Sequence, residues 1–169
     1  NQEKANILRR VFAGVVSTGA DRILVMPDHS GLARPAAADV EGQIKVEYVE
    51  MGVADHQGAS TRAAQAMAEQ GVDCIVTLGG DGTNRVVAKG AGEVPLVPIS
   101  TGTNNVFPAN TEGTLAGMAA GALATGVLTR DEACRRSKRI DIYVNGERRD
   151  DALVDAAVST QMFVGARAV

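Results

Sequence analysis

An apolar run that ends in a cluster of glycines constrains the fold of this chain most strongly. Cys74–Leu78 is short, rich in β-branched residues and bounded by turn formers, which is typical of a strand buried on both faces. The pentapeptide Gly79-Gly80-Asp81-Gly82-Thr83 follows at once. Glycine permits positive φ and has no Cβ to hold a ligand away, so we expect the N–H groups of this turn to surround an anion.

The residues after the turn predict a helix that strengthens this anion site. Thr83 and Asn84 begin a segment that continues through Val86 and Val87, and the positive end of such a helix would point into the same space. Asp81 does not suit a simple phosphate site, because its carboxylate would repel a phosphate unless a cation or a proton to be removed justifies it. We therefore interpret Asp81 as a group that does chemistry.

Two commoner phosphate motifs do not fit this turn. A Walker loop requires a Lys-Ser or Lys-Thr pair after its last glycine, and no such pair follows Gly82. A dinucleotide-binding fingerprint requires three glycines spaced two and then three residues apart, which Gly79, Gly80 and Gly82 do not supply.

Helical and strand patterns alternate along most of the chain. Strands are predicted over residues 22–26, 45–51, 74–78 and 95–100, and helices over 3–17, 35–40, 60–70, 83–90 and 110–126. This alternation predicts an α/β fold with a parallel sheet covered by helices on both faces. Ligands of such sheets bind at the carboxyl ends of strands, where the turn after Leu78 and the loop after Ser100 both lie.

Two of the predicted helices carry specific expectations. We expect Ser60 to cap one helix, and Asn110 or Thr111 to cap the other. Gly71 and Gly126 are expected to end them. The predicted inner faces are Ala63, Ala64, Met67 and Ala68 in the first helix, and Leu115, Met118, Ala119, Ala122 and Leu123 in the second.

The pattern changes after a charged connector at residues 129–139. Ile140–Val144 and Arg148–Ser159 flank Asn145-Gly146, and Asn-Gly between two strands is a strong hairpin signal. We therefore predict an α/β core domain over residues 1–138 and the beginning of an antiparallel β-rich domain over residues 139–169.

Composition excludes several classes of partner. The 169 residues carry a net charge of -3 and only 3% are aromatic, which argues against a nucleic-acid partner. No apolar run approaches the length of a membrane span, about 20 residues. Cys74 and Cys134 form no disulfide framework, which favours the cytoplasm. No residues are predicted to bind a metal, since His29 and His56 lack ligand partners at suitable spacing.

A second loop, together with the glycine turn, carries a resemblance to a known family. The loop Thr101-Gly102-Thr103-Asn104-Asn105 follows the glycine turn by about 20 residues. The pair resembles the superfamily of NAD kinases, diacylglycerol and sphingosine kinases and, more remotely, phosphofructokinases. The sequence of Ile99–Pro108 is most similar to that of the ATP-NAD kinase-like branch, which includes the acetoin-catabolism protein X family.

The resemblance implies a Rossmann-like kinase domain that uses ATP and Mg²⁺. It implies that Asp81 is catalytic and activates the acceptor hydroxyl of NAD or a related small metabolite, which links the chain to NADP biosynthesis and acetoin catabolism. Nucleotide-binding residues carried over from the family motifs are Gly79, Gly80, Gly82, Thr83, Thr101, Gly102, Thr103, Asn104 and Asn105. Self-association is a further implication. The family's first strand, with its own glycine-rich loop, is expected to be missing before Asn1.

Two departures from the family patterns leave the acceptor open. NAD kinases typically present an Asn-Glu pair in the β-rich domain, where this chain has Val154-Asp155. Diacylglycerol kinases usually have Asn-Asp in the second loop, where this chain has Asn105-Val106. A lipid kinase and a non-catalytic nucleotide-binding regulator therefore remain alternatives to a small-molecule kinase.

Overall fold

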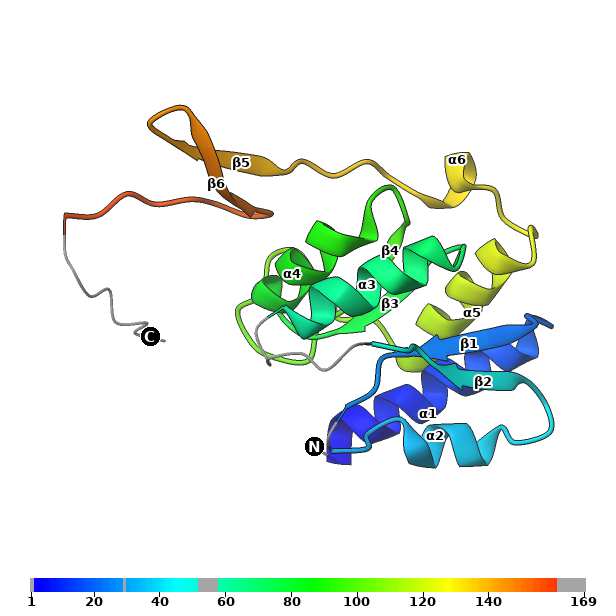
Figure 1. The fold of residues 1–169 in the computed structure, drawn as a ribbon. Helices are drawn as coiled ribbons and strands as arrows, with labels where there is room; N and C mark the ends of the chain where they lie inside the picture. Colours follow the sequence, from blue (N-terminus) through cyan, green and yellow to red (C-terminus); the bar gives the residue numbers. More distant parts are fainter. Residues whose placement is uncertain (1, 29, 52–57, 161–169) are drawn as a thin grey trace.

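The computed structural model describes residues 2–28, 30–51 and 58–160, and Figure 1 shows their arrangement. The helices are α1 (Gln2–Ser17), α2 (Arg34–Asp39), α3 (Ala59–Glu69), α4 (Asp81–Ala91), α5 (Gly113–Ala124) and α6 (Arg130–Ala133). The strands are β1 (Arg22–Val25), β2 (Lys45–Tyr48), β3 (Ile75–Leu78), β4 (Leu96–Ile99), β5 (Ile140–Val144) and β6 (Glu147–Ala152). The predicted α/β class is confirmed. His29 and His56 lie outside the described residues.

The strands form three separate pairs. β1 pairs with β2 and β3 with β4, both in parallel, while β5 and β6 are antiparallel. Each parallel pair is joined by a helix, α2 between β1 and β2 and α4 between β3 and β4. The sequence predicted one parallel sheet, whereas among the described residues the parallel strands occur as two pairs that are not bonded to each other.

Helices cover both faces of the two parallel pairs, as predicted. One face, called here face A, packs against α1, α2 and α5 through residues such as Ile23, Val25, Val76 and Ile99. The other, face B, packs against α3 and α4 through alternate residues such as Leu24 and Ile75. Because side chains alternate along a strand, this division shows that β1 and β3 present the same two faces. The two pairs therefore lie in one layer between two helical layers (Figure 1).

Helix α5 packs against α1 through its small residues, which corrects the predicted inner face. The buried residues of α5 are Gly113, Ala116, Gly117, Ala120 and Gly121. Leu115 is 61% exposed and Met118 is 44% exposed. A Cβ on Gly117 would overlap the Val11 carbonyl, and one on Gly14 would overlap the Thr114 carbonyl. The two backbones thus lie too close together for large side chains between them, so hydrophobicity alone assigned the wrong face.

The predicted N-caps were also wrong. Helix α3 begins at Ala59 after Gly58, whose φ is 90°, and Ser60 lies inside the helix. The N-cap of α5 is Glu112, whose carboxylate accepts hydrogen bonds from the Thr114 and Leu115 N–H groups. These bonds, led by that of Thr114, lower the pKa of Glu112. The predicted terminating glycines are confirmed, with φ of 73° at Gly71 and 74° at Gly126.

The predicted hairpin near the C-terminus is confirmed. Asn145 and Gly146 have φ of 53° and 81°, the left-handed backbone that a two-residue hairpin turn requires. Strand β6 ends at Ala152, earlier than the predicted end at Ser159. The division into domains over residues 1–138 and 139–169 remains a prediction.

Candidate functional site

The glycine turn connects β3 directly to α4. Gly80 is the N-cap in extended backbone, and the helix begins at Asp81, two residues before the predicted start at Thr83. Gly82 and Thr83 therefore lie in the first turn of the helix. The first N–H groups of a helix have no partner within it, so this end is suited to an anion.

The glycines of this turn serve close approach, which corrects the predicted use of positive φ. Gly79, Gly80 and Gly82 are absent from the glycines with positive φ. A Cβ on Gly79 would overlap the Thr83 side chain, and one on Gly80 would lie 2.5 Å from Asn105 Oδ1. A Cβ on Gly82 would meet nothing within 4 Å. Two of the three glycines thus make room for protein groups of the same site.

The structure brings the two predicted loops together. The Asp81 carboxylate accepts hydrogen bonds from the Phe107 N–H at 2.8 Å and the Val106 N–H at 3.1 Å. The Gly79 N–H donates to the Ile99 carbonyl at 3.1 Å. The sequence placed both loops at one edge of the sheet, and these contacts confirm that adjacency. The roles of Asp81 and of the loop residues stay predictions.

The second loop is organised by its own polar groups. Asn105 Nδ2 donates to Ser100 Oγ at 2.9 Å, and Ser100 Oγ donates to the Gly102 carbonyl at 3.1 Å. Asn104 has a left-handed φ of 61°, which asparagine tolerates better than most residues. Gly102, Thr103 and Asn104 are exposed, while Thr101 and Asn105 are partly buried. The loop therefore has a fixed base at Asn105 and a solvent-facing tip.

The buried side chain of Asn84 holds the glycine turn in place through hydrogen bonds, a role that the sequence did not predict. Its side chain is fully buried. Thr77 Oγ1 donates to Asn84 Oδ1 at 2.6 Å, and Asn84 Nδ2 donates to the Gly80 carbonyl at 2.9 Å. These bonds tie the end of β3 to the start of α4 across the turn. The signal for this role in the sequence was the position of Asn84 three residues before Val87 and seven before Ala91, on the otherwise apolar buried face of α4.

An ion-pair cluster joins α4 to the C-terminal hairpin, and the sequence reasoning missed it too. Arg85 Nη1 lies 2.8 Å from an Asp150 carboxylate oxygen, and Lys89 Nζ lies 2.6 Å from the other. Lys89 Nζ is also 3.1 Å from the Asp151 carboxylate, which is 1% exposed. The hydrogen bond from Lys89 is the main cause of an Asp150 pKa far below its usual range, and the same bond raises the pKa of Lys89.

No group of three or more metal-ligating side chains occurs among the described residues. Asp81 is the carboxylate at the meeting point of the loops. Mg²⁺ commonly binds proteins through one or two carboxylates together with the phosphates of a substrate, and the single carboxylate of Asp81 fits that mode of binding.

In the basic connector, Arg136 pairs with Glu93 and Arg139 with Asp141. None of the described helices is both long enough and apolar enough to cross a membrane.

Comparison of the sequence with known proteins gives matches to the family that the two loops of this site resemble. Residues 1–131 match the ATP-NAD kinase N-terminal domain, and residues 138–169 match the acetoin catabolism protein X C-terminal domain. Acetoin catabolism protein X of Cupriavidus necator is 42% identical over 179 residues, which cover 99% of this chain and 50% of that protein. The chain thus spans about half the length of this relative. No solved structure gives a significant match. By its first 131 residues, this chain belongs to the ATP-NAD kinase family.

Proposed function

We propose that this chain carries the catalytic acid and nucleotide-binding loops of an ATP-dependent kinase, which transfers a phosphate to a hydroxyl of NAD or a related small metabolite. The observation that carries the proposal is the contact of the Asp81 carboxylate with the backbone N–H groups of Phe107 at 2.8 Å and Val106 at 3.1 Å, directly after the second loop. The Asp81 carboxylate thereby lies where the glycine turn, the start of α4 and the end of the second loop meet.

The N-terminal end of α4 is the proposed phosphate site. Backbone N–H groups of Gly79, Gly80, Gly82 and Thr83, with the Thr83 hydroxyl, would contact phosphate oxygens, and the helix dipole adds positive potential there. The second loop, Thr101 to Asn105, would bind the rest of the nucleotide. Amide side chains both donate and accept hydrogen bonds, which suits ribose hydroxyls and adenine edges.

Asp81 is the proposed general base. Two backbone N–H donors, those of Val106 and Phe107, orient its carboxylate. The acceptor hydroxyl gives its proton to Asp81 as its oxygen forms a bond to the γ-phosphorus, and the bond from that phosphorus to the bridging oxygen breaks as ADP leaves. When bound with the nucleotide, Mg²⁺ would offset the charge of the phosphates.

The sequence and the structure point to the class of reaction more specifically than to the phosphate acceptor. Val154-Asp155 stands where NAD kinases carry Asn-Glu, so the proposal names NAD or a related small metabolite, with a protein that binds a nucleotide without turnover as one alternative. A diacylglycerol-type lipid kinase is the remaining alternative. The proposed partner is a small-molecule nucleotide rather than nucleic acid or a membrane, in a self-associating cytoplasmic protein that takes part in acetoin catabolism.

The test uses the full-length protein with ATP and Mg²⁺ and three acceptors, NAD, NADH and diacylglycerol. Asp81→Asn should lower product formation at least about 100-fold, since general bases contribute that much or more. Asp131→Asn, an exposed carboxylate on α6, is the matched control and should keep full activity. Equal activity of wild type and Asp81→Asn would remove Asp81 from the mechanism. ATP binding by calorimetry without any product would favour the non-catalytic regulator.

A further inference from the structure

The β5–β6 hairpin is attached to α4 by polar contacts. Among the described residues, neither of the two hydrophobic core clusters contains a residue of β5 or β6. Ile140, Tyr143 and Val144 of the hairpin are exposed instead. A hairpin of two strands is only marginally stable on its own in water. The position of this hairpin beside α4 therefore depends on the ion pairs between them.

One side of α4 carries both the proposed general base and the groups that bind the hairpin. Asp81, Arg85 and Lys89 are spaced four residues apart, so they lie on the same side of the helix. Along the helix axis, Arg85 lies about 6 Å from Asp81 and Lys89 about 12 Å. Arg85 Nη1 contacts the Asp150 carboxylate at 2.8 Å and the Asp151 carbonyl at 3.3 Å. The end of β6 therefore lies along the side of α4 that begins with Asp81.

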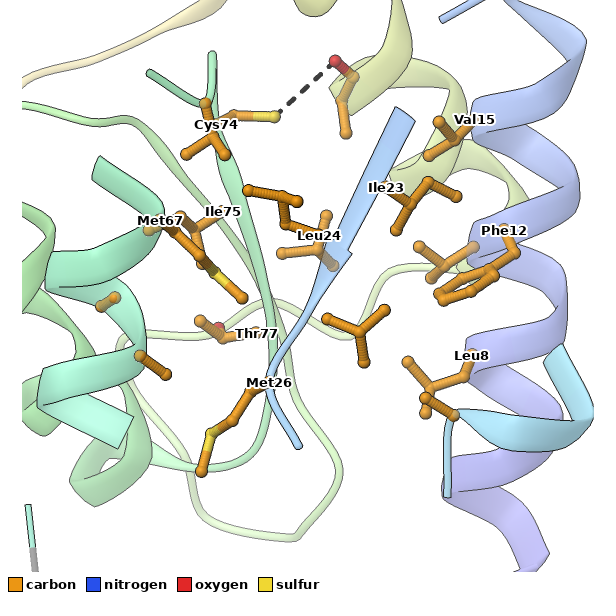
Figure 2. A pocket seen from close by; sticks show the side chains of 18 of the residues that line it. Leu8, Phe12, Val15, Ile23, Leu24, Met26, Met67, Cys74, Ile75 and Thr77 are labelled. Atoms are coloured by element: carbon orange, nitrogen blue, oxygen red, sulfur yellow. Dashed lines mark hydrogen bonds between the residues drawn. The ribbon is translucent and has the colours of Figure 1, made fainter. Parts of the chain in front are cut away.

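The position of α4 is itself set by the core, because its other side packs on face B. Val87 and Ala91 belong to one hydrophobic cluster with Ile75 of β3 and Met67 of α3. Figure 2 shows Ile75 directed toward Met67, with Thr77 on the same side of the strand. The hairpin is thus attached to a helix whose place relative to β3 is fixed by buried contacts.

Lys89 balances the charge of a carboxylate that is almost fully buried. The Asp151 side chain is 1% exposed, and neither of its oxygens has a hydrogen-bond partner in the part of the chain that the structure describes. Lys89 Nζ lies 3.1 Å from one oxygen, and Arg148 lies 3.9 Å from the other. Since Arg148 belongs to the hairpin itself, Lys89 ties the Asp151 carboxylate to α4. A buried carboxylate that loses its cation is strongly unfavourable.

We propose that Lys89 is a positioning residue of the kinase reaction: by pairing with Asp150 and Asp151 together, it holds the end of β6 beside Asp81 as one wall of the phosphate-acceptor site. This inference rests on the proposed function. An acceptor hydroxyl that reaches Asp81 lies at the first turn of α4, next to the turn that contacts β6 through Arg85. The proposed ATP site is formed by the glycine turn and the second loop, both within the α/β domain. Lys89 therefore acts on the binding of the acceptor and not on that of ATP.

Steady-state kinetics of the full-length protein tests this role. Lys89→Met keeps most of the apolar stem and removes the charge. The KM for the acceptor should rise about tenfold or more, because breaking a buried ion pair costs more than the free energy that corresponds to tenfold. The KM for ATP should change by less than about twofold, and kcat should fall less than the acceptor KM rises.

Two further substitutions at Lys89 separate its charge from its size. Lys89→Arg keeps a cation and should have an acceptor KM close to that of the wild type. Lys89→Glu places a like charge opposite Asp150 and Asp151, so its acceptor KM should exceed that of Lys89→Met. Lys45→Met is the matched control, since Lys45 makes a 2.9 Å ion pair with Glu47 on β2, and it should change neither KM.

The role of Lys89 and the proposed function fail in different ways. If the wild type forms no product with NAD, NADH or diacylglycerol, the kinase reaction fails and the role of Lys89 fails with it. If the wild type forms product and Lys89→Met keeps the acceptor KM, only the role of Lys89 is overturned. An equal rise in the KM for ATP and for the acceptor would also overturn it, because that pattern indicates a general loss of structure. So would a Lys89→Glu variant that binds the acceptor as well as Lys89→Arg.

Discussion

Adding one methyl group at Gly80 tests whether the two loops depend on close contact. In Gly80→Ala, the new Cβ would lie 2.5 Å from Asn105 Oδ1. The amide must then retreat by about 1 Å to restore van der Waals separation, and it is held by a 2.9 Å hydrogen bond to Ser100 Oγ. Overpacking costs about 1–3 kcal/mol, and losing that hydrogen bond about 0.5–1.5 kcal/mol. We expect the free energy of unfolding to fall by about 2 kcal/mol.

Gly82→Ala is the matched control for this substitution. It adds the same methyl group two residues away in the first turn of α4, where the Cβ would meet nothing within 4 Å. Replacing a helical glycine by alanine should stabilise the protein by about 0.5–1 kcal/mol. Urea unfolding with linear extrapolation measures both effects. If Gly80→Ala proves as stable as Gly82→Ala, the contact between Gly80 and Asn105 does not constrain the site, and our account of the glycines fails.

The remaining predictions concern the hairpin and the helix pair. The pKa of Asp150 is lowered, so its ion pair with Lys89 contributes fully above the usual carboxyl pKa of 3.8 and is lost as the pH falls through the lower folded value. NMR shifts of β5 and β6 should therefore stay constant near neutral pH and change only in acid; a transition at neutral pH would contradict this assignment. Gly117→Ala should lower the unfolding free energy by about 1–3 kcal/mol, because its Cβ would overlap the Val11 carbonyl. Leu115→Ala should change the urea midpoint little, and a larger loss at this exposed position would refute the described α5 packing.

Local signals in the sequence predicted the local structure well. Left-handed glycines after helices marked the ends of α3 and α5, and Asn145-Gly146 marked the hairpin, because these conformations are set by a few adjacent residues. The adjacency of the two loops was also predictable, since parallel strands end at the same edge.

Features that depend on distant partners could not be predicted. The inner face of α5 is set by how closely α1 approaches at Gly14, and neither helix alone reveals that distance. The buried role of Asn84 depends on Thr77 and on the path of the turn. The predicted positive φ in the glycine turn failed for the same reason, because the glycines make room for Thr83 and Asn105.

Helix α4 is held at both ends by different parts of the chain. Its first residue, Asp81, is hydrogen-bonded to the second loop, and about 12 Å farther along the axis Lys89 is paired with the hairpin. The carboxylate of Asp81 and the C-terminal hairpin, which belongs to the segment that matches the second family domain, are therefore attached to opposite ends of one helix.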